Sequence, residues 1–153
     1  MGKHDFDFLN GSSWRIANRR CNQDGVWEEF AATGNAEMHV DGLVQFDRYD
    51  APAFPGRGHV EAVTVRAYDE ETAQWSIVWL ANYSPPDLRP VVGAWNGDTG
   101  AFSQTIETAD GRPWDVRFEC SRRDPDHPRW EQHFSFDRGS TWEFNWSMDD
   151  TRL

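Results

Sequence analysis

The sequence has few basic residues relative to acidic ones and no long apolar run, and each of these features argues against a class of partner. Lys3 is the only lysine among 15 basic residues, which face 26 acidic ones, and the formal net charge at pH 7 is -11. Such a charge opposes binding to a nucleic-acid backbone or to an anionic membrane surface. No apolar run approaches the length of a membrane-spanning helix. We therefore expect neither nucleic acid nor membrane as a partner.

Cysteine is also scarce, and the two residues present, Cys21 and Cys120, are not required to pair by any feature of the sequence. The N-terminal stretch MGKHDFDFLNG lacks the apolar region of a secretory signal. With no indication of an oxidising compartment, we expect reduced thiols and a cytoplasmic protein.

Aromatic side chains supply most of the capacity to form a core. Hydrophobic residues make up 38% of the chain and the mean hydropathy is -0.80, values that are low for a packed protein. Nine Trp, ten Phe and three Tyr change that expectation, because rings bury a large area per residue. We therefore predict one folded domain, residues 1–153, with a core of few, large side chains.

Alternation of apolar and polar residues predicts strands, most clearly in residues 129–148. Trp130 and Phe134 share one face of the first strand, and Phe144 and Trp146 share one face of the second. Gly139 lies in the turn between them and is free to adopt positive φ. The other predicted strands are residues 14–21, 26–40, 43–49, 60–68, 74–80, 91–96, 101–108 and 114–121.

Short turns join most of these strands, as at Asp41-Gly42 and Asp110-Gly111. Residues 50–58 and 81–90 are rich in Pro and are predicted to be longer loops, the first of them a lid. Residues 5–9 are expected to form a single helical or 3₁₀ turn that plugs part of the fold.

About ten short antiparallel strands must lose their free edges, and closing into a barrel removes them. Barrels of eight to ten strands leave room for a small ligand as well as for side chains. A two-sheet sandwich is the alternative, although its crossovers need longer connections than these turns offer. The predicted fold class is all-β, an up-and-down antiparallel β-barrel with a short N-terminal helical turn.

The segment Phe8-Leu9-Asn10-Gly11-Ser12-Ser13-Trp14 resembles the opening of the lipocalin-like (calycin) barrels, in which Gly-x-Trp leads into the first strand. The spacing here is Gly-x-x-Trp, one residue longer. Those barrels often close with a basic residue of the last strand over that Trp. The resemblance gives this role to Arg152, which would form a cation–π pair with Trp14.

The whole chain is also similar to a family of small, uncharacterised bacterial proteins with this barrel. The likeness lies in the segments DFDFL (5–9), WSIVWL (75–80), PVVG (90–93), DGRP (110–113), RWEQ (129–132) and TWEFNW (141–146). This resemblance implies a lipocalin-like fold and assigns no catalytic residue.

Polar residues in the apolar phase of a strand are the main clue to a site, because a buried polar group needs a partner. Glu28, Gln104 and Gln132 occupy such positions, and Arg66 and Asn18 do so if their neighbours face inward. They either orient a ligand in an aromatic pocket or satisfy one another, for example as a Glu28–Arg66 pair. Glu28 and Arg66 are also candidates for acid–base catalysis, since desolvation would shift the pKa of the carboxylate.

Several aromatic residues of the inward phase are candidates for the wall of a site, with simple core packing as the alternative. A barrel of this width is not easily filled, which favours a cavity. The predicted ligand-binding residues are Trp14, Glu28, Arg66, Trp79, Gln104, Phe118, Gln132, Phe134, Phe144 and Trp146.

No spacing of His, Cys or carboxylates predicts a metal site, and neither Gly-x-Ser-x-Gly nor a glycine-rich phosphate loop occurs. We therefore expect no metal and no cofactor. Haem ligated by His133 or His39 is kept as an alternative, because some lipocalin-like barrels hold haem through one strand histidine. In a second alternative the barrel is inverted, its rings lie between the subunits of a homodimer, and the cavity is lined by Glu131, Glu143 and Asn145.

The predicted function is binding of a small hydrophobic or aromatic organic molecule in the barrel cavity, entered between residues 50–58 and 81–90. One alternative is a cofactor-independent cyclase or isomerase of natural-product biosynthesis. Such an enzyme needs confinement and one or two hydrogen-bonding groups more than a nucleophile. A haem-binding barrel and a purely structural or dimerising role are the remaining alternatives.

Overall fold

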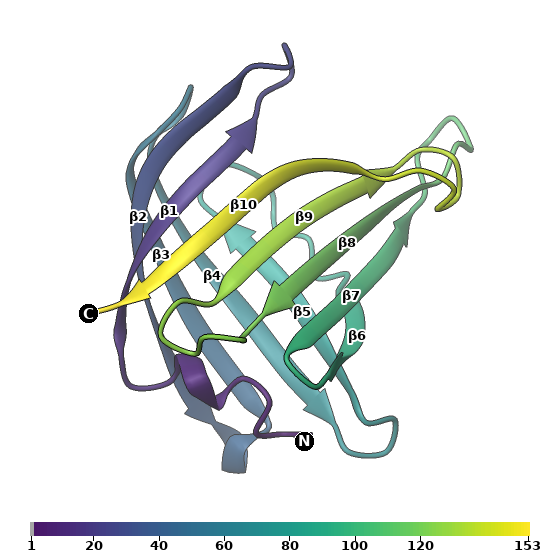
Figure 1. The fold of residues 1–153 in the computed structure, drawn as a ribbon. Helices are drawn as coiled ribbons and strands as arrows, with labels where there is room; N and C mark the ends of the chain where they lie inside the picture. Colours follow the sequence, from purple (N-terminus) through teal and green to yellow (C-terminus); the bar gives the residue numbers. More distant parts are fainter. Residues whose placement is uncertain (1) are drawn as a thin grey trace.

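The computed structural model describes residues 2–153 and arranges them as one antiparallel sheet that closes on itself (Figure 1). Ten strands run up and down in chain order, preceded by the 3₁₀ turn η1 (Asp7–Leu9). The strands are β1 (Ser13–Cys21), β2 (Trp27–His39), β3 (Val44–Phe54), β4 (Gly58–Asp69), β5 (Gln74–Ala81), β6 (Val91–Asn96), β7 (Thr99–Ile106), β8 (Trp114–Ser121), β9 (Arg129–Ser135) and β10 (Glu143–Arg152). A second 3₁₀ turn, η2 (Val40–Gly42), joins β2 to β3.

Each strand pairs with its neighbours in sequence, and β1 pairs with β10 to complete the ring. In that last pairing Trp14 lies opposite Arg152, and Arg20 lies opposite Trp146. The predicted ten-stranded, up-and-down, lipocalin-like barrel is therefore confirmed, and the two-sheet sandwich is excluded.

The prediction that residues 50–58 form a long loop or lid is wrong. β3 continues to Phe54 and β4 begins at Gly58, so that only a short turn separates them. Ala51 and Phe54 are buried, and the ring of Phe54 packs 4.6 Å from that of Phe30, which holds this segment in the sheet. A register shift between Ala51 and Phe54 accommodates the Pro within it. The loop predicted after β5 is present, since no strand lies between Ala81 and Val91.

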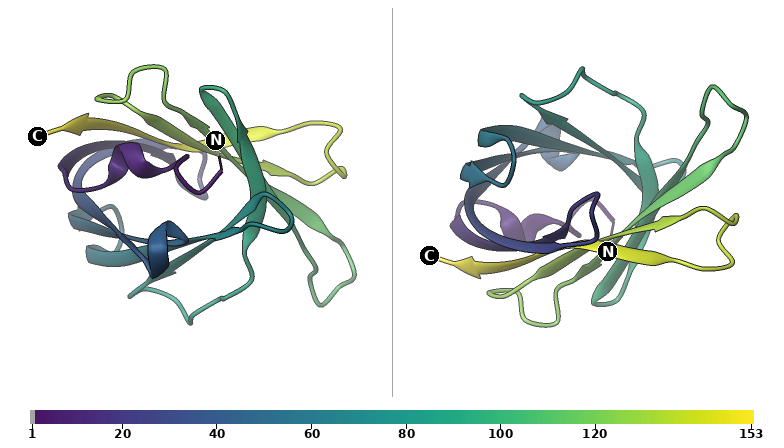
Figure 2. Two further views of the ribbon diagram at one scale, coloured as in Figure 1. Left: turned by 90° about the horizontal axis from the view of Figure 1, so that it is seen from below. Right: turned by 90° about the horizontal axis from the view of Figure 1, so that it is seen from above.

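Residues 5–9, here named the N-terminal plug, lie across one end of the barrel (Figure 2). The ring of Phe6 lies 4.9 Å from that of Trp75 and 5.3 Å from that of Trp95. Gln45 donates a hydrogen bond of 3.0 Å from its amide to the carbonyl of Phe6. This end of the barrel is therefore filled, as the sequence predicts.

The N-terminal plug is fastened to the last strand through one guanidinium. Arg152 lies over the ring of Trp14, with its Cζ 4.5 Å from the ring centroid, which confirms the predicted cation–π pair. The same guanidinium donates to the carbonyl of Phe8 at 3.0 Å, to Ser12 Oγ at 2.6 Å and to Asp126 Oδ1 at 2.7 Å. Trp14 Nε1 in turn donates to the carbonyl of Leu9 at 3.0 Å.

The large rings point into the barrel, so the inverted arrangement is not adopted. Trp14, Trp75, Trp95 and Trp146 are all buried. At the end opposite the N-terminal plug, the β7–β8 and β9–β10 hairpins extend away from the rest of the barrel (Figure 1). Among residues 2–153, no helix has the length and apolar character needed to cross a membrane.

We predict that Arg152→Ala lowers the free energy of unfolding by about 2–4 kcal/mol, because several charge-assisted hydrogen bonds and the Trp14 contact are lost together. Arg152→Lys should recover only part of this loss, since an ammonium cannot reproduce the planar fork. Urea unfolding, monitored by tryptophan fluorescence, measures the free energy of unfolding of both variants. Arg123→Ala, on an exposed residue of the β8–β9 loop, is the matched control. An Arg152→Ala variant as stable as this control would contradict the assigned role.

Candidate functional site

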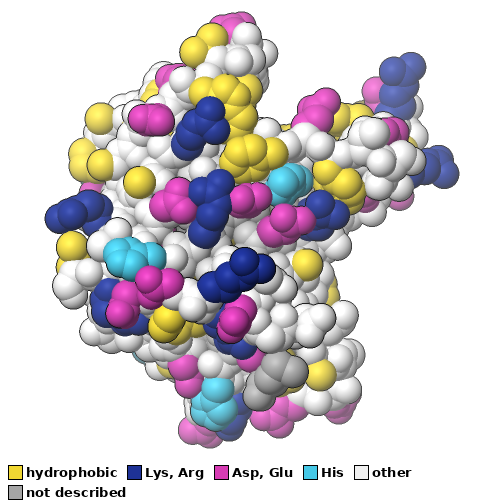
Figure 3. Space-filling model, in the orientation of Figure 1, with side chains coloured by type: hydrophobic (Ala, Val, Ile, Leu, Met, Phe, Trp, Pro, Cys, Tyr) yellow, Lys and Arg dark blue, Asp and Glu magenta, His cyan; other side chains and the backbone are white. Residues whose placement is uncertain are grey.

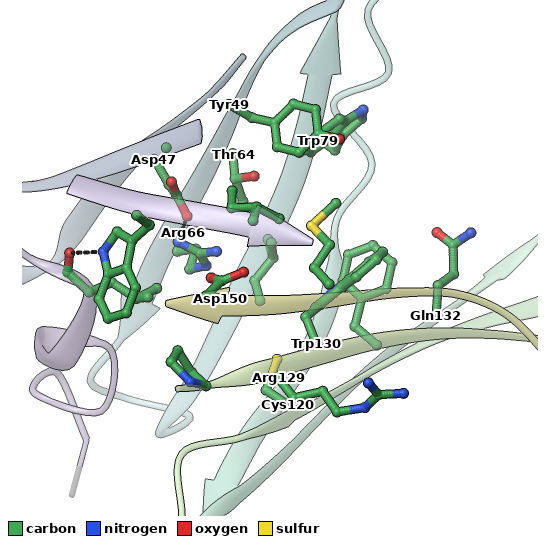
Figure 4. Close-up of a pocket in the computed structure, with 18 of the residues that line it drawn as sticks. Asp47, Tyr49, Thr64, Arg66, Trp79, Cys120, Arg129, Trp130, Gln132 and Asp150 are labelled. Carbon is green, nitrogen blue, oxygen red and sulfur yellow. Dashed lines mark hydrogen bonds and ion pairs between the residues drawn. The ribbon is translucent and has the colours of Figure 1, made fainter. Parts of the chain in front are cut away.

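A cavity of about 250 Å³ lies inside the barrel, above the N-terminal plug (Figure 4). One part of its wall consists of large apolar side chains from β1, β5, β8, β9 and β10: Trp14, Ile16, Trp79, Phe118, Trp130, Trp146 and Met148. The other part is a polar cluster on β3, β4, β8 and β10: Asp47, Thr64, Arg66, Cys120 and Asp150. The cavity thus combines an aromatic wall with a few buried polar groups.

Several predicted ligand-binding residues meet at this cavity, and others do not. Those that line it are Trp14, Arg66, Trp79, Phe118, Gln132 and Trp146. Those outside its lining are Glu28, Gln104, Phe134 and Phe144.

Glu28 does not pair with Arg66. Its Oε1 accepts a hydrogen bond of 2.8 Å from the side chain of Asn22, in the turn between β1 and β2. It lies opposite Arg20, near the end of β1 that is remote from the N-terminal plug, so the two groups occupy different levels of the barrel. Gln104 pairs with Val116 near the far end of β7 and is likewise outside the cavity.

Phe144 lies outside the cavity because of an irregularity that alternation cannot reveal. The β9–β10 register shifts between Phe144 and Trp146, and Asn145 is the extra residue. Phe144 therefore pairs with His133 and packs 5.3 Å from the ring of Trp27, whereas Trp146 faces inward. Phe134 packs against Trp114, with ring centroids 4.8 Å apart, near the extended hairpins.

Arg66 is held by neighbours on β3. Its Nη1 lies 2.9 Å from Asp47 Oδ2 and 2.8 Å from Gln45 Oε1, and its Cζ lies 4.8 Å from the ring centroid of Phe6. Burial raises the pKa of Asp47, and the neighbouring Arg66 charge opposes that rise. The guanidinium is thus paired inside the barrel with the carboxylate of Asp47.

Asp150 reaches toward the same cluster from β10 (Figure 4). Burial raises the pKa of Asp150 to about 7; the charge of Asp47 adds to this shift and that of Arg66 opposes it. Its Oδ1 is buried and has no hydrogen-bond partner within the described residues 2–153. Asp150 is therefore the unsatisfied group of the cavity, and its charge changes near neutral pH.

Two further polar groups of the cavity, Cys120 and Tyr49, are neutral. Burial raises the pKa of Cys120 to about 12, which keeps the thiol protonated and removes it as a nucleophile. Burial also raises the pKa of Tyr49. The Tyr49 hydroxyl donates a hydrogen bond of 2.9 Å to Asn18 Oδ1. Asn18 Oδ1 also accepts a hydrogen bond of 3.2 Å from Trp146 Nε1, so that Asn18 fixes the rings of both Tyr49 and Trp146.

The sequence interpretation missed Asp47, Asp150, Tyr49 and Trp130 as lining residues. For Asp150 a usable signal exists, because Trp146, Met148 and Asp150 are spaced by two along β10. Tyr49 and Asp47 share a strand phase with Gln45 in the same way. Only the pairing of β3 with β4 brings Asp47 next to Arg66, and local alternation does not predict that contact.

The histidines considered for haem lie on the outer face. Acidic, basic and histidine side chains stand side by side on the surface seen in Figure 3. His133 Nε2 lies 3.0 Å from Glu131 Oε1 and 3.4 Å from Glu119 Oε2, and Arg129 Nε also pairs with Glu131 at 2.7 Å. His39 is exposed beside Glu37. Neither His133 nor His39 reaches the cavity.

Within residues 2–153, clusters of potential metal-ligating atoms occur at this surface and at one other place. The two sets are Glu119, Glu131 and His133, and Asp50, His59 and Glu61. In the first set Arg117 and Arg129 already pair with the glutamates at 2.8 and 2.7 Å. The second set consists of surface side chains that are close to half exposed or more. Both sets lie apart from the cavity.

We predict that the stability of the protein falls as pH rises from about 4 to about 7, partly through Asp150. The folded-state pKa of about 7 lies above the ordinary value of 3.8, so folding favours the protonated acid, and its stabilising contribution disappears as pH rises through 7. Asp150→Asn should remove this dependence and make the variant more stable than the wild type by about 2–4 kcal/mol at pH 8. The two proteins should converge below pH 4.

Urea unfolding at a series of pH values measures the effect, with Asp98→Asn, in the exposed β6–β7 turn, as the matched control. Parallel stability profiles for the wild type and Asp150→Asn would contradict the buried, unsatisfied state of this carboxyl.

The comparisons with known proteins support the fold alone. No family model and no curated protein sequence matches the chain. Among solved structures, the S-type phycobiliprotein lyase CPES from Guillardia theta is similar, with a TM-score of 0.61 and 12% sequence identity. The alignment covers 100% of this chain and 93% of that one. Membership of a bacterial family stays a prediction, and the barrel architecture is the shared feature.

Proposed function

We propose that this barrel binds one small, largely apolar organic molecule in its interior. The observation that carries the proposal is the cavity of about 250 Å³ between the aromatic wall and the buried polar cluster. Ligand sites in proteins combine a mostly apolar lining with a few polar groups that fix orientation, and this lining has both. The likeness to a phycobiliprotein lyase supports the proposal only as an analogy of fold.

The cavity favours a compact ligand. Its volume lies just below the range of roughly 300–1,000 Å³ that is usual for drug-sized molecules. A molecule with a single ring or with two fused rings matches this volume and can stack against Trp79, Trp130 and Phe118. Haem finds less support, because the volume is small for a macrocycle and no histidine among residues 2–153 lines the cavity.

Entry is proposed at the end of the barrel opposite the N-terminal plug. Tyr83, in the loop after β5, lines the cavity there and accepts a hydrogen bond of 3.2 Å from Trp79 Nε1. Arg57, in the turn between β3 and β4, lies over the ring of Tyr83 with its Cζ 4.1 Å from the centroid. These two connections correspond to the entrance that the sequence suggests.

We predict that the protein binds the neutral bicyclic probe 2-naphthylmethanol, and that Thr64→Met weakens this binding at least tenfold. Thr64 is buried and lines the cavity, so the longer side chain takes space that the probe needs. Thr33→Met, on the exposed face of β2, adds the same atoms outside the barrel and should leave the affinity unchanged. Isothermal titration calorimetry measures the affinity of the wild type and of both variants for the probe.

Absence of any binding heat from the wild type would count against a cavity open to small molecules. Equal affinities in the wild type and in Thr64→Met would show that the probe binds elsewhere.

Catalysis of isomerisation is a second candidate function, and Asp150 is the observation that favours it. A carboxyl with a pKa of about 7 in a confined apolar site is suited to proton transfer at neutral pH. Acting on a β,γ-unsaturated ketone, the carboxylate would remove a proton from the carbon between the carbonyl and the double bond. The double bond would move into conjugation as the same proton returned to the γ carbon, and the paired Arg66 would stabilise the enolate oxygen.

We predict for this candidate that the protein converts 3-cyclohexen-1-one to 2-cyclohexen-1-one, with a rate that rises with pH through about 7 as the carboxylate forms. Ultraviolet absorbance of the conjugated enone measures the reaction. Asp150→Asn should abolish it, and the control Asp98→Asn should retain it. A rate no greater than that of buffer, or one unaffected by Asp150→Asn, would remove this candidate for simple unsaturated ketones.

A further inference from the structure

The charges of the polar cluster on the cavity wall do not balance. Asp47 and Asp150 contribute two carboxylates to the polar cluster, and Arg66 contributes one guanidinium. Arg66 is already engaged by Asp47 at 2.9 Å and by Gln45 at 2.8 Å. When Asp150 is ionised, the cluster therefore carries one negative charge without a matching positive one.

Asp150 is held rigidly where this charge develops. Its backbone N–H donates a hydrogen bond of 3.0 Å to the carbonyl of Pro128, and its Cα lies opposite that of Ile16 in β1. The side chain of Asp150 lines the cavity, while its Oδ1 is buried without a hydrogen-bond partner among the described residues. A buried acceptor left unsatisfied costs about 1–3 kcal/mol, and more when it is charged. An ionised Asp150 is therefore costly unless a hydrogen-bond donor or a positive charge lies beside it.

The remaining ionisable groups near Asp150 do not supply this donor. Burial keeps the Cys120 thiol protonated and neutral, and Asp149 on the neighbouring position adds negative charge. Arg129 lines the cavity with part of its side chain, but its guanidinium pairs with Glu131 and Asp149, each at 2.7 Å. Each nearby group is neutral, negative or already paired.

Arg20 is the third arginine on the cavity lining, and it lies too far along the barrel to pair with Asp150. In the β1–β10 pairing, Arg20 lies opposite Trp146, whereas Asp150 lies opposite Ile16. Arg20 is therefore four residues farther along β1 than the level of Asp150, a distance of about 13 Å. Its Cζ lies 5.2 Å from the ring centroid of Trp146 and 5.3 Å from that of Phe54. Arg20 therefore belongs to the open end of the cavity and does not neutralise Asp150.

From this geometry we propose that the ligand carries a positively charged nitrogen and that Asp150 is the group that anchors it. The inference rests on the proposed binding function and adds the chemical class of the ligand: an aromatic or otherwise apolar body with a protonated amine. The amine pairs with the Asp150 carboxylate, and the body lies against Trp130 and Phe118, whose rings meet edge to face at 5.0 Å. An anionic ligand is disfavoured, since Asp47 and Asp150 would repel it and Arg66 is already paired.

The aromatic wall supports the same class of ligand. The faces of aromatic rings attract cations, and several arginines already use this attraction in the barrel, with Arg66 over Phe6 and Arg152 over Trp14. Trp130 is on β9 directly opposite Met148, one inward position from Asp150 on β10. An ammonium group bound to Asp150 therefore lies close to aromatic faces as well as to a carboxylate.

A matched series of probes tests the proposal: 2-naphthylmethylamine, which is an ammonium ion at pH 8, neutral 2-naphthylmethanol, and anionic 2-naphthoate. Calorimetry at pH 8 should give the ammonium probe at least tenfold tighter binding than the alcohol, and the weakest binding for the naphthoate. Asp150→Asn should make the ammonium and alcohol affinities equal. Asp98→Asn, which removes a carboxylate from the exposed β6–β7 turn, should retain the preference.

The pH dependence gives a second readout. At pH 5.5 Asp150 is protonated, since its pKa lies near 7, so the preference for the ammonium probe should shrink, while the affinity for the alcohol should stay constant. A shift of the preference with pH in Asp150→Asn equal to that in the wild type would assign the effect to another group and overturn the proposal.

The outcomes separate this inference from the binding function beneath it. Equal binding of the ammonium and alcohol probes by the wild type would overturn the anchor and leave the binding function intact. Retention of the ammonium preference in Asp150→Asn would also overturn it, by locating the cation elsewhere. Failure of all three probes to bind would overturn the binding function and the anchor together.

Discussion

The pairing of β1 with β10 is the constraint on which the rest of this structure depends. Without it the sheet would present two free edges, and the rings of its inner face would be exposed to water. Arg152 strengthens the junction because one planar guanidinium covers Trp14 and reaches both the N-terminal plug and the β8–β9 loop. Closure directs large side chains toward one axis, and their packing then decides which part of the interior is solid and which part is hollow.

The interior is filled unevenly for a physical reason. Near the N-terminal plug, Phe6 fits between Trp75 and Trp95, so rings from distant segments interlock there. Higher in the barrel, Trp79 and Trp146 meet at 6.0 Å, where Trp146 Nε1 donates a hydrogen bond to Asn18 and Trp79 Nε1 donates one to Tyr83. Rings fixed at their edges cannot collapse inward to fill the remaining volume. A cavity with defined walls is the consequence, and its polar cluster lies where the two regions meet.

Much of the fold could be predicted from the sequence, because alternation, turn residues and aromatic content all indicate the same closed sheet. The candidate site was predictable only in part. Trp14, Trp79 and Trp146 follow the alternation and line the cavity. Phe144 does not, because one extra residue in β10 reverses the face of everything before it. Glu28 has the expected phase but lies at the wrong level of the barrel, and level depends on strand pairing and stagger rather than on local pattern.

The polar cluster also explains why a closed, aromatic barrel retains a carboxyl that it cannot satisfy. Above neutral pH an ionised Asp150 opposes folding, since desolvation and the charge of Asp47 outweigh the attraction of Arg66. A positively charged ligand would offset both penalties by attraction to the carboxylate, so that ligand binding and folding would be linked through one side chain. A neutral apolar residue at this position would make the empty barrel more stable but would leave its interior without charge selectivity. The carboxylate that opposes folding above neutral pH is therefore also the group on which the proposed charge selectivity depends.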